Sequence, residues 1–120
     1  MAQTPATTWS DDGSIDYTPS AAVTGGDVIV LGSIVAVATD DIAANVKGSL
    51  SIDGIYKVPK ITGVITVGAK VYWDPAGSPV TGDASSGAAT PTAGSLKVMG
   101  YAVLAAASGD SYVYVDLQRA

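Results

Sequence analysis

Short runs of β-branched and aromatic residues recur along this chain, and each is stopped within a few residues by Gly, Pro or Asp. The stretch Gly48–Asp74 shows this most strongly, because it holds one of the two Trp and two of the six Tyr residues. Leu50 to Val58 mostly alternates apolar and polar positions, the period of two expected of a half-buried strand. A second run, Val71–Trp73, stops at Asp74-Pro75, a pair that initiates turns. Two strands are therefore predicted at the middle of the chain.

The acidic residues favour the same class of structure. All 11 are Asp and none is Glu, and Asp suits turns and caps whereas Glu suits helix interiors. With 14 Gly and 6 Pro in 120 residues, the chain is typical of short strands joined by tight turns. We predict an all-β fold, a small β-barrel or sandwich of short antiparallel strands, with no helix longer than about three turns.

The core is predicted to be thin. Hydrophobic residues make up 48% of the chain, but much of this is Ala and Val, and there is no Phe. Small side chains bury little apolar area each, at about 25 cal/mol per Å². Contact between subunits would bury more surface, so the composition favours a protein that is not a monomer.

Further strands are predicted on both sides of the centre, at Ile15–Thr18, Asp27–Leu31, Ile34–Ala38, Leu96–Ala106 and Tyr112–Leu117. The two residues Gly32-Ser33 lie between two of these runs and favour a β-hairpin. In the last strand Tyr112, Tyr114 and Asp116 share one face, and the Val and Leu residues between them share the other. Residues Ile42–Asn45 are predicted to form a single helical turn capped by an Asp.

Pro59 cannot donate a hydrogen bond to a strand ladder, so the strand is predicted to end there or to lie at a sheet edge. Lys57 and Lys60 flank it and are interpreted as solvated charges that prevent further pairing there. Between Pro75 and Ser95 the chain is rich in Ala, Gly, Ser, Thr and Pro, and Val80 is the one sizeable apolar residue. This composition predicts a long surface loop with a short strand around Val80.

One short pattern occurs three times, with a turn glycine just before an apolar strand. Its copies are Gly26-Asp27-Val28, Gly68-Ala69-Lys70 and Gly109-Asp110-Ser111. Two interpretations stay open: a diverged internal repeat, or three separate hairpin starts. The second is the simpler one in a chain this rich in strands.

Catalytic and metal-binding chemistry is poorly supported. The chain has no His, Cys or Glu, which removes the usual general bases and most metal ligands. Gly63–Val71 partly matches a phosphate-binding loop, but Ala69 displaces the lysine of that motif by one position and Val71 has no hydroxyl to hold Mg²⁺. The acidic segments Asp11–Asp16 and Asp40-Asp41 fit turns and caps better than a Ca²⁺ loop, which needs a distant Glu, and an adventitious weak cation site is the alternative left open. We therefore predict no catalytic residue, no cofactor and no metal site.

Charge and hydropathy also exclude two classes of partner. The net charge of −5 disfavours binding to a phosphate backbone, so no nucleic-acid partner is predicted. The longest purely apolar run, Ala102–Ala107, is far too short to cross a bilayer, so no membrane partner is predicted.

Residues 1–14 are predicted to form an extended arm before a single domain at 15–120. The arm is polar except for one large apolar residue, Trp9. Two interpretations of Trp9 stay open: its indole folds back on its own domain, or it anchors a partner. Trp9, with Ile15 and Tyr17 in the strand that follows, forms the set of candidate contact residues.

A set of segments, taken in order, is similar to one known family: Asp16–Pro19, Gly26–Ser33, Val37–Ala44, Gly54–Lys60, Gly68–Asp74 and Ala106–Asp110. Over about Ile15–Leu117 the chain resembles the small tailed-phage capsid cement (decoration) proteins, which are often mislabelled as RecA/RadA-like recombinases. The resemblance implies a compact β-barrel or sandwich that assembles as a homotrimer on the outer surface of the phage head. It implies a structural virion protein without enzymatic activity, whose partners are itself and the major capsid protein.

The candidate contacts Trp9, Ile15 and Tyr17 would then meet the capsid or a neighbouring subunit. Two other functions are kept as alternatives. The first is a nucleotide-dependent recombination accessory protein, as the common label would have it. The second is a receptor-binding or fibre-type β module that uses the Tyr-bearing face of the last strand.

Overall fold

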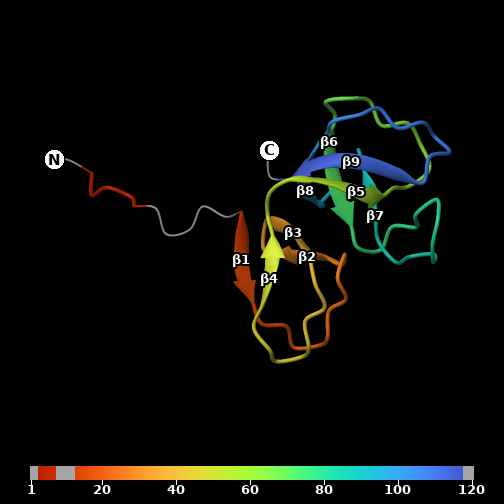
Figure 1. The fold of residues 1–120 in the computed structure, drawn as a ribbon. Coiled ribbons are helices and arrows are strands. Elements are labelled where there is room, and N and C mark those ends of the chain that lie inside the picture. Colours follow the sequence, from red (N-terminus) through yellow and green to blue (C-terminus); the bar gives the residue numbers. More distant parts are fainter. Residues whose placement is uncertain (1–2, 8–12, 118–120) are drawn as a thin grey trace.

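The computed structural model describes residues 3–7 and 13–117, which contain nine strands and no helix. The strands are β1 (Ser14–Tyr17), β2 (Val28–Leu31), β3 (Ile34–Ala38), β4 (Gly48–Ser51), β5 (Ile55–Pro59), β6 (Lys70–Asp74), β7 (Ala88–Thr90), β8 (Lys97–Ala102) and β9 (Tyr112–Leu117). They form two antiparallel sheets, ordered β1-β4-β3-β2 and β5-β9-β8-β6-β7 (Figure 1). Neither sheet closes into a barrel, so the all-β prediction is confirmed in its sandwich-like form.

The two sheets repeat one topology. The order β1-β4-β3-β2 matches β5-β9-β8-β6 strand for strand, and β7 is an addition to the second sheet. An isolated bridge between Val23 and Ile42 extends the β2–β3 ladder, and the bridge between Ile65 and Ala106 extends the β6–β8 ladder in the same way. We call residues 13–53 repeat 1 and residues 55–117 repeat 2. Figure 1 shows repeat 1, in red to yellow, below repeat 2, in green to blue.

The hydrogen bonds at the two bridges confirm the correspondence. The Gly26 amide donates to the Ala38 carbonyl at 2.6 Å, and the Gly68 amide donates to the Ala102 carbonyl at 2.7 Å. On the first strand of the ladder, each residue of repeat 1 corresponds to the residue 42 positions later in repeat 2 (26 to 68). On the second strand the offset is 64 positions (38 to 102). The longer second interval contains β7 and the loop around it. The glycine pattern at Gly26 and Gly68 therefore belongs to an internal structural repeat, and in both copies the glycine comes just before a strand of an antiparallel ladder.

Each repeat has its own core, and β3 joins the two. Ala36 and Ala38 face the core of repeat 1, which contains Leu50 and Ile42. Val35 and Val37, on the opposite face of β3, are buried in the core of repeat 2. A strand covered on both faces has no polar side, which explains the unbroken apolar run of β3. The contact between the repeats is therefore part of the hydrophobic core.

The predicted strand between Leu50 and Val58 is two strands in the structure. β4 ends at Ser51 in one sheet and β5 starts at Ile55 in the other. Gly54 lies between them with φ of 100°, a conformation that residues with a Cβ rarely adopt. The chain changes sheets there while its alternation of apolar and polar residues continues, so the sequence pattern does not reveal the break.

Two local predictions are wrong, and one is confirmed. Ile42–Asn45 is not helical, because Ile42 is bridged to Val23 and Asn45 has φ of 62°. The strand in the 75–95 segment is β7, not a strand around Val80. β7 has the sequence Ala-Ala-Thr, which lacks the large apolar residues that mark a strand. The Gly32-Ser33 hairpin is confirmed, with positive φ at Gly32 as expected of a type II′ turn.

The edge predicted from Pro59 is confirmed, because β5 is the first strand of the five-stranded sheet. Lys57 is exposed as predicted, but Lys60 is completely buried. Its Nζ donates to the carbonyls of Ala107 at 3.0 Å and of Ser108 and Asp110 at 3.4 Å each. The prediction of a solvated Lys60 is therefore wrong, because a turn distant in the sequence supplies the acceptors that make its burial possible.

Candidate interaction surface

The outer face of the five-stranded sheet carries four of the six tyrosines: Tyr72, Tyr101, Tyr112 and Tyr114. Strand register places Tyr101 near the two tyrosines of β9, and Tyr72 farther along the same face on β6. Tyr101 pairs with both Lys70 and Asp116, and Tyr114 pairs with Lys57. We call the four tyrosines with Lys57 and Lys70 the tyrosine face.

Alternation along the strands produces this face. In β9 the residues Val113 and Val115 are buried in the core of repeat 2, while Tyr112 and Tyr114 are 39% and 42% exposed. β6 follows the same rule, with Tyr72 half-buried on the outer side and Trp73 in the core. The predicted division of the last strand into a tyrosine side and a buried aliphatic side is confirmed.

A cation–π contact organises part of the face. The Nζ of Lys57 lies 4.6 Å from the centroid of the Tyr112 ring. This contact keeps a positive charge on the surface of β5 and β9, within a protein whose net charge is −5. Asp116 lies on the same face, paired with Tyr101, so the tyrosine face carries charges of both signs.

Such a surface is suited to binding another protein. Tyrosine presents a large rigid ring at low cost in side-chain entropy, and its hydroxyl can still form a hydrogen bond when the ring is covered. Tyrosines are accordingly enriched among the residues that dominate binding at interfaces. The two lysines add a preference for a partner that offers carboxylates or carbonyls.

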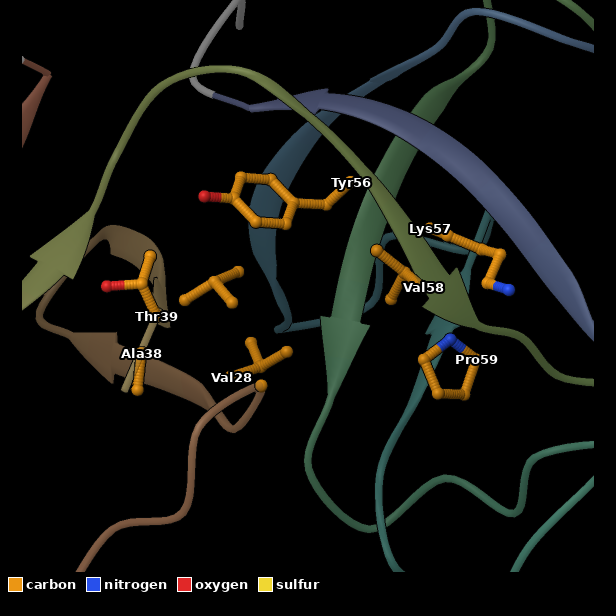
Figure 2. A pocket seen from close by; sticks show the side chains of 9 residues that line it. Val28, Ala38, Thr39, Tyr56, Lys57, Val58 and Pro59 are labelled. Atoms are coloured by element: carbon orange, nitrogen blue, oxygen red, sulfur yellow. The ribbon is translucent and has the colours of Figure 1, made fainter. Parts of the chain in front are cut away.

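A groove separates the two repeats next to this face. Its cavity of about 270 Å³ is lined by Gly26, Val28, Val37, Ala38, Thr39, Tyr56, Lys57, Val58 and Pro59. Figure 2 shows Tyr56 and Val58 of β5 on one side, with Val28 and Ala38 on the other. The lining has no carboxylate, and hydroxyl groups come only from Thr39 and Tyr56. The groove therefore lacks an acid–base pair and is an apolar seam.

The predicted contact residues lie elsewhere. Trp9 is outside the described residues. Ile15 and Tyr17 lie on β1, at the edge of the four-stranded sheet, and both are half-buried against the core of repeat 1. The structure thus brings Ile15 and Tyr17 together but away from the tyrosine face.

Tyr72 and Tyr101 were missed from the candidate site. Alternation within β6 and β8 could have assigned them to an outer face, but only the pairing of β8 with β9 puts Tyr101 next to the tyrosines of β9, and Tyr72 lies farther along the same face, opposite Val98.

A second cavity, of about 490 Å³, is lined by Gly26, Asp27, Val28, Ile29, Pro59, Trp73, Pro79, Thr81, Gly82, Ser86 and Gly87. Within 3–7 and 13–117, no three His, Cys, Asp or Glu residues gather as metal ligands. The same part of the chain has no helix long and apolar enough to span a membrane. The segment that partly matches a phosphate-binding loop leads into β6, a strand, and its Lys70 lies on the tyrosine face. What the geometry offers is a surface for contact between proteins.

Comparison with known families gives that surface a context. A family model described as phage cement protein matches residues 9–117. The chain belongs to the phage cement protein family. No curated protein and no solved structure gave a match. As a phage cement protein the chain has a structural role in the virion and associates with the capsid. The resemblance stated from the sequence is therefore confirmed.

Proposed function

We propose that this phage cement protein binds the outer surface of the phage head and stabilises the shell against the pressure of packaged DNA. It acts without catalysis, as a homotrimer, and its partner is the major capsid protein. The observation that carries this proposal is the family match over residues 9–117. The tyrosine face supports it, because its rings are suited to contact with another protein. The groove, in the described residues, offers no acid–base pair for catalysis.

Binding alone is sufficient for stabilisation. A protein that contacts two neighbouring capsomers must be released before they can separate, so its binding free energy adds to the barrier against rupture. The thin core fits this role, because a small domain of Ala and Val gains stability from each contact that it makes. We assign the capsid contact to the tyrosine face, since its rings and lysines combine apolar area with polar specificity.

The first test is decoration of heads that lack the native protein. Wild-type protein should bind these heads and raise the temperature at which they release DNA. The double variant Tyr112→Ser/Tyr114→Ser should bind at least about tenfold more weakly, because each covered tyrosine contributes on the order of 1–2 kcal/mol. Occupancy is measured by negative-stain imaging and by sedimentation of heads across a dilution series.

The matched control is Val46→Ser, which removes an apolar side chain that is 53% exposed in repeat 1. It should decorate heads as the wild type does. Full occupancy by the double tyrosine variant would refute the role of the tyrosine face. Wild-type protein that leaves the heads bare but binds host cells would show a receptor-binding module instead.

A second test concerns the arm. We propose that Trp9 anchors the protein to the capsid or to an adjacent subunit. Ile15 and Tyr17, at the start of the domain, would contribute to the same contact. Trp9→Ala should leave the melting temperature unchanged and lower occupancy on heads, because the anchor is lost without any change to the core. Thr4→Ala, in the same arm, is the control. Equal occupancy of Trp9→Ala and wild type across the dilution series would end the anchor hypothesis.

A further inference from the structure

The end of repeat 2 carries three exposed aliphatic residues. Val64 and Val67 precede β6 and Leu104 follows β8, and they are 63%, 64% and 56% exposed. The ladder that continues through the Ile65–Ala106 bridge connects Gly63 to Ser108 and Gly68 to Ala102, which places Val67 across from Leu104. Val64 lies on the other side of Ile65 in the same ladder, across from Ala107. We call Val64, Val67 and Leu104 the apolar tip. Single exposed aliphatic residues are common on proteins, so the tip needs further evidence before it is given a role.

Repeat 1 supplies that evidence as an internal control. The same backbone ladder there ends in the Val23–Ile42 bridge, with a matching turn and a matching glycine hydrogen bond. The positions that correspond to the tip are Ala22, Gly25 and Asp40, and all three are exposed. The ladder therefore forms without aliphatic residues at these positions. Folding does not explain why repeat 2 has them, and contact with a partner does.

The charges of the protein are divided between the repeats. Repeat 1 contains five Asp and one Lys, a net charge of −4, whereas repeat 2 contains four Lys and four Asp and is neutral. The apolar tip lies at the side of repeat 2 away from repeat 1, where the segments around Ile65 and Ala106 run side by side (Figure 1). The tip is thus the neutral end of an acidic molecule.

We infer that the apolar tip is the surface through which copies of this chain contact one another. Two chains of charge −5 repel each other. The repulsion is weakest when the neutral ends meet and the acidic repeats point apart, because salt at physiological concentration screens exposed charges that are more than about 8 Å apart. An apolar patch also needs an apolar partner, and the same patch on another copy provides one. This inference rests on the self-assembly that is part of the proposed function.

The test exchanges the tip for the residues that repeat 1 carries at the same positions, in the variant Val64→Ala/Val67→Gly/Leu104→Asp. Wild-type protein should be oligomeric in sedimentation velocity and light scattering. The exchanged variant should be monomeric at the same concentrations, with self-association weakened at least about 100-fold. Circular dichroism and a cooperative thermal transition check that it folds. Ile34→Ser, which removes an aliphatic residue that is 40% exposed in repeat 1, is the control and should leave the oligomer intact.

The outcomes separate this inference from the proposal on which it rests. A folded exchanged variant that remains oligomeric would overturn the role of the tip but leave self-assembly standing. If that variant also fails to decorate heads, the tip contacts the capsid and not a second copy. Wild-type protein that is monomeric at all concentrations, and on heads, would overturn both the inference and the homotrimer.

Discussion

Replacing Lys60 with Ala should lower the free energy of unfolding by about 3 kcal/mol, from the lost packing of three methylene groups and the loss of a charged hydrogen-bond donor. Lys60 is completely buried, and its Nζ is held by the carbonyls of Ala107, Ser108 and Asp110. It thereby ties the end of β5 to the turn before β9. For a domain of this size the loss corresponds to a melting temperature about 10 °C lower.

Two further variants separate the causes. Lys60→Met keeps most of the buried chain but removes the donor, so it should cost less than Lys60→Ala, about 1–2 kcal/mol. Lys57→Ala removes an exposed lysine that lies two strand positions before Pro59 and, with the loss of its cation–π contact, should change stability by less than about 1 kcal/mol. Chemical denaturation of the three variants gives the comparison. Equal stability of Lys60→Ala and wild type would contradict the burial of Lys60 and the hydrogen bonds of its Nζ.

Substituting Gly100 with Ala should be at least as damaging. An added Cβ at Gly100 would collide with the backbone carbonyl of Asp116 on the neighbouring strand. Backbone cannot move aside as a side chain can, so β8 and β9 would have to separate where Gly100 pairs with Leu117. We expect a loss of more than about 3 kcal/mol, typical of severe overpacking in a core, or failure to fold.

The matched control is Gly109→Ala. An added Cβ there meets no atom within 4 Å, and Gly109 has no positive φ. This variant should be neutral or slightly stabilising, because Ala restricts the unfolded chain more than Gly does. Thermal and denaturant unfolding of the two variants should therefore differ strongly. A Gly100→Ala protein as stable as Gly109→Ala would contradict the close approach of β8 and β9.

Features that depend on neighbours in sequence were predictable. The Gly32-Ser33 hairpin follows from turn chemistry, and the edge position of β5 follows from the missing amide of Pro59. The alternation of Tyr112 and Tyr114 with buried residues follows from the pleat of a strand. In each case the physical cause acts within a few residues, so no distant contact was needed to recognise it.

Features that depend on distant partners were not predictable. From sequence alone Lys60 is predicted to be a surface lysine, because the acceptors that allow its burial come from a distant turn at 107–110. β7 is a strand because it pairs with β6 and is buried, and its small residues give no sign of this. Gly54 marks a change of sheet inside a pattern that continues without interruption.

The candidate surfaces divide in the same way. The two tyrosines of β9 can be assigned to one face from that strand alone. Tyr72 and Tyr101 are placed on the same face only by the pairing of β6, β8 and β9. The apolar tip is recognised only because repeat 1 shows the same ladder with Ala22, Gly25 and Asp40. Local residue chemistry is thus sufficient for the class of fold and for the faces of single strands. Pairing between distant strands is required to assemble those faces into surfaces, because register is set by the packing of the whole sheet.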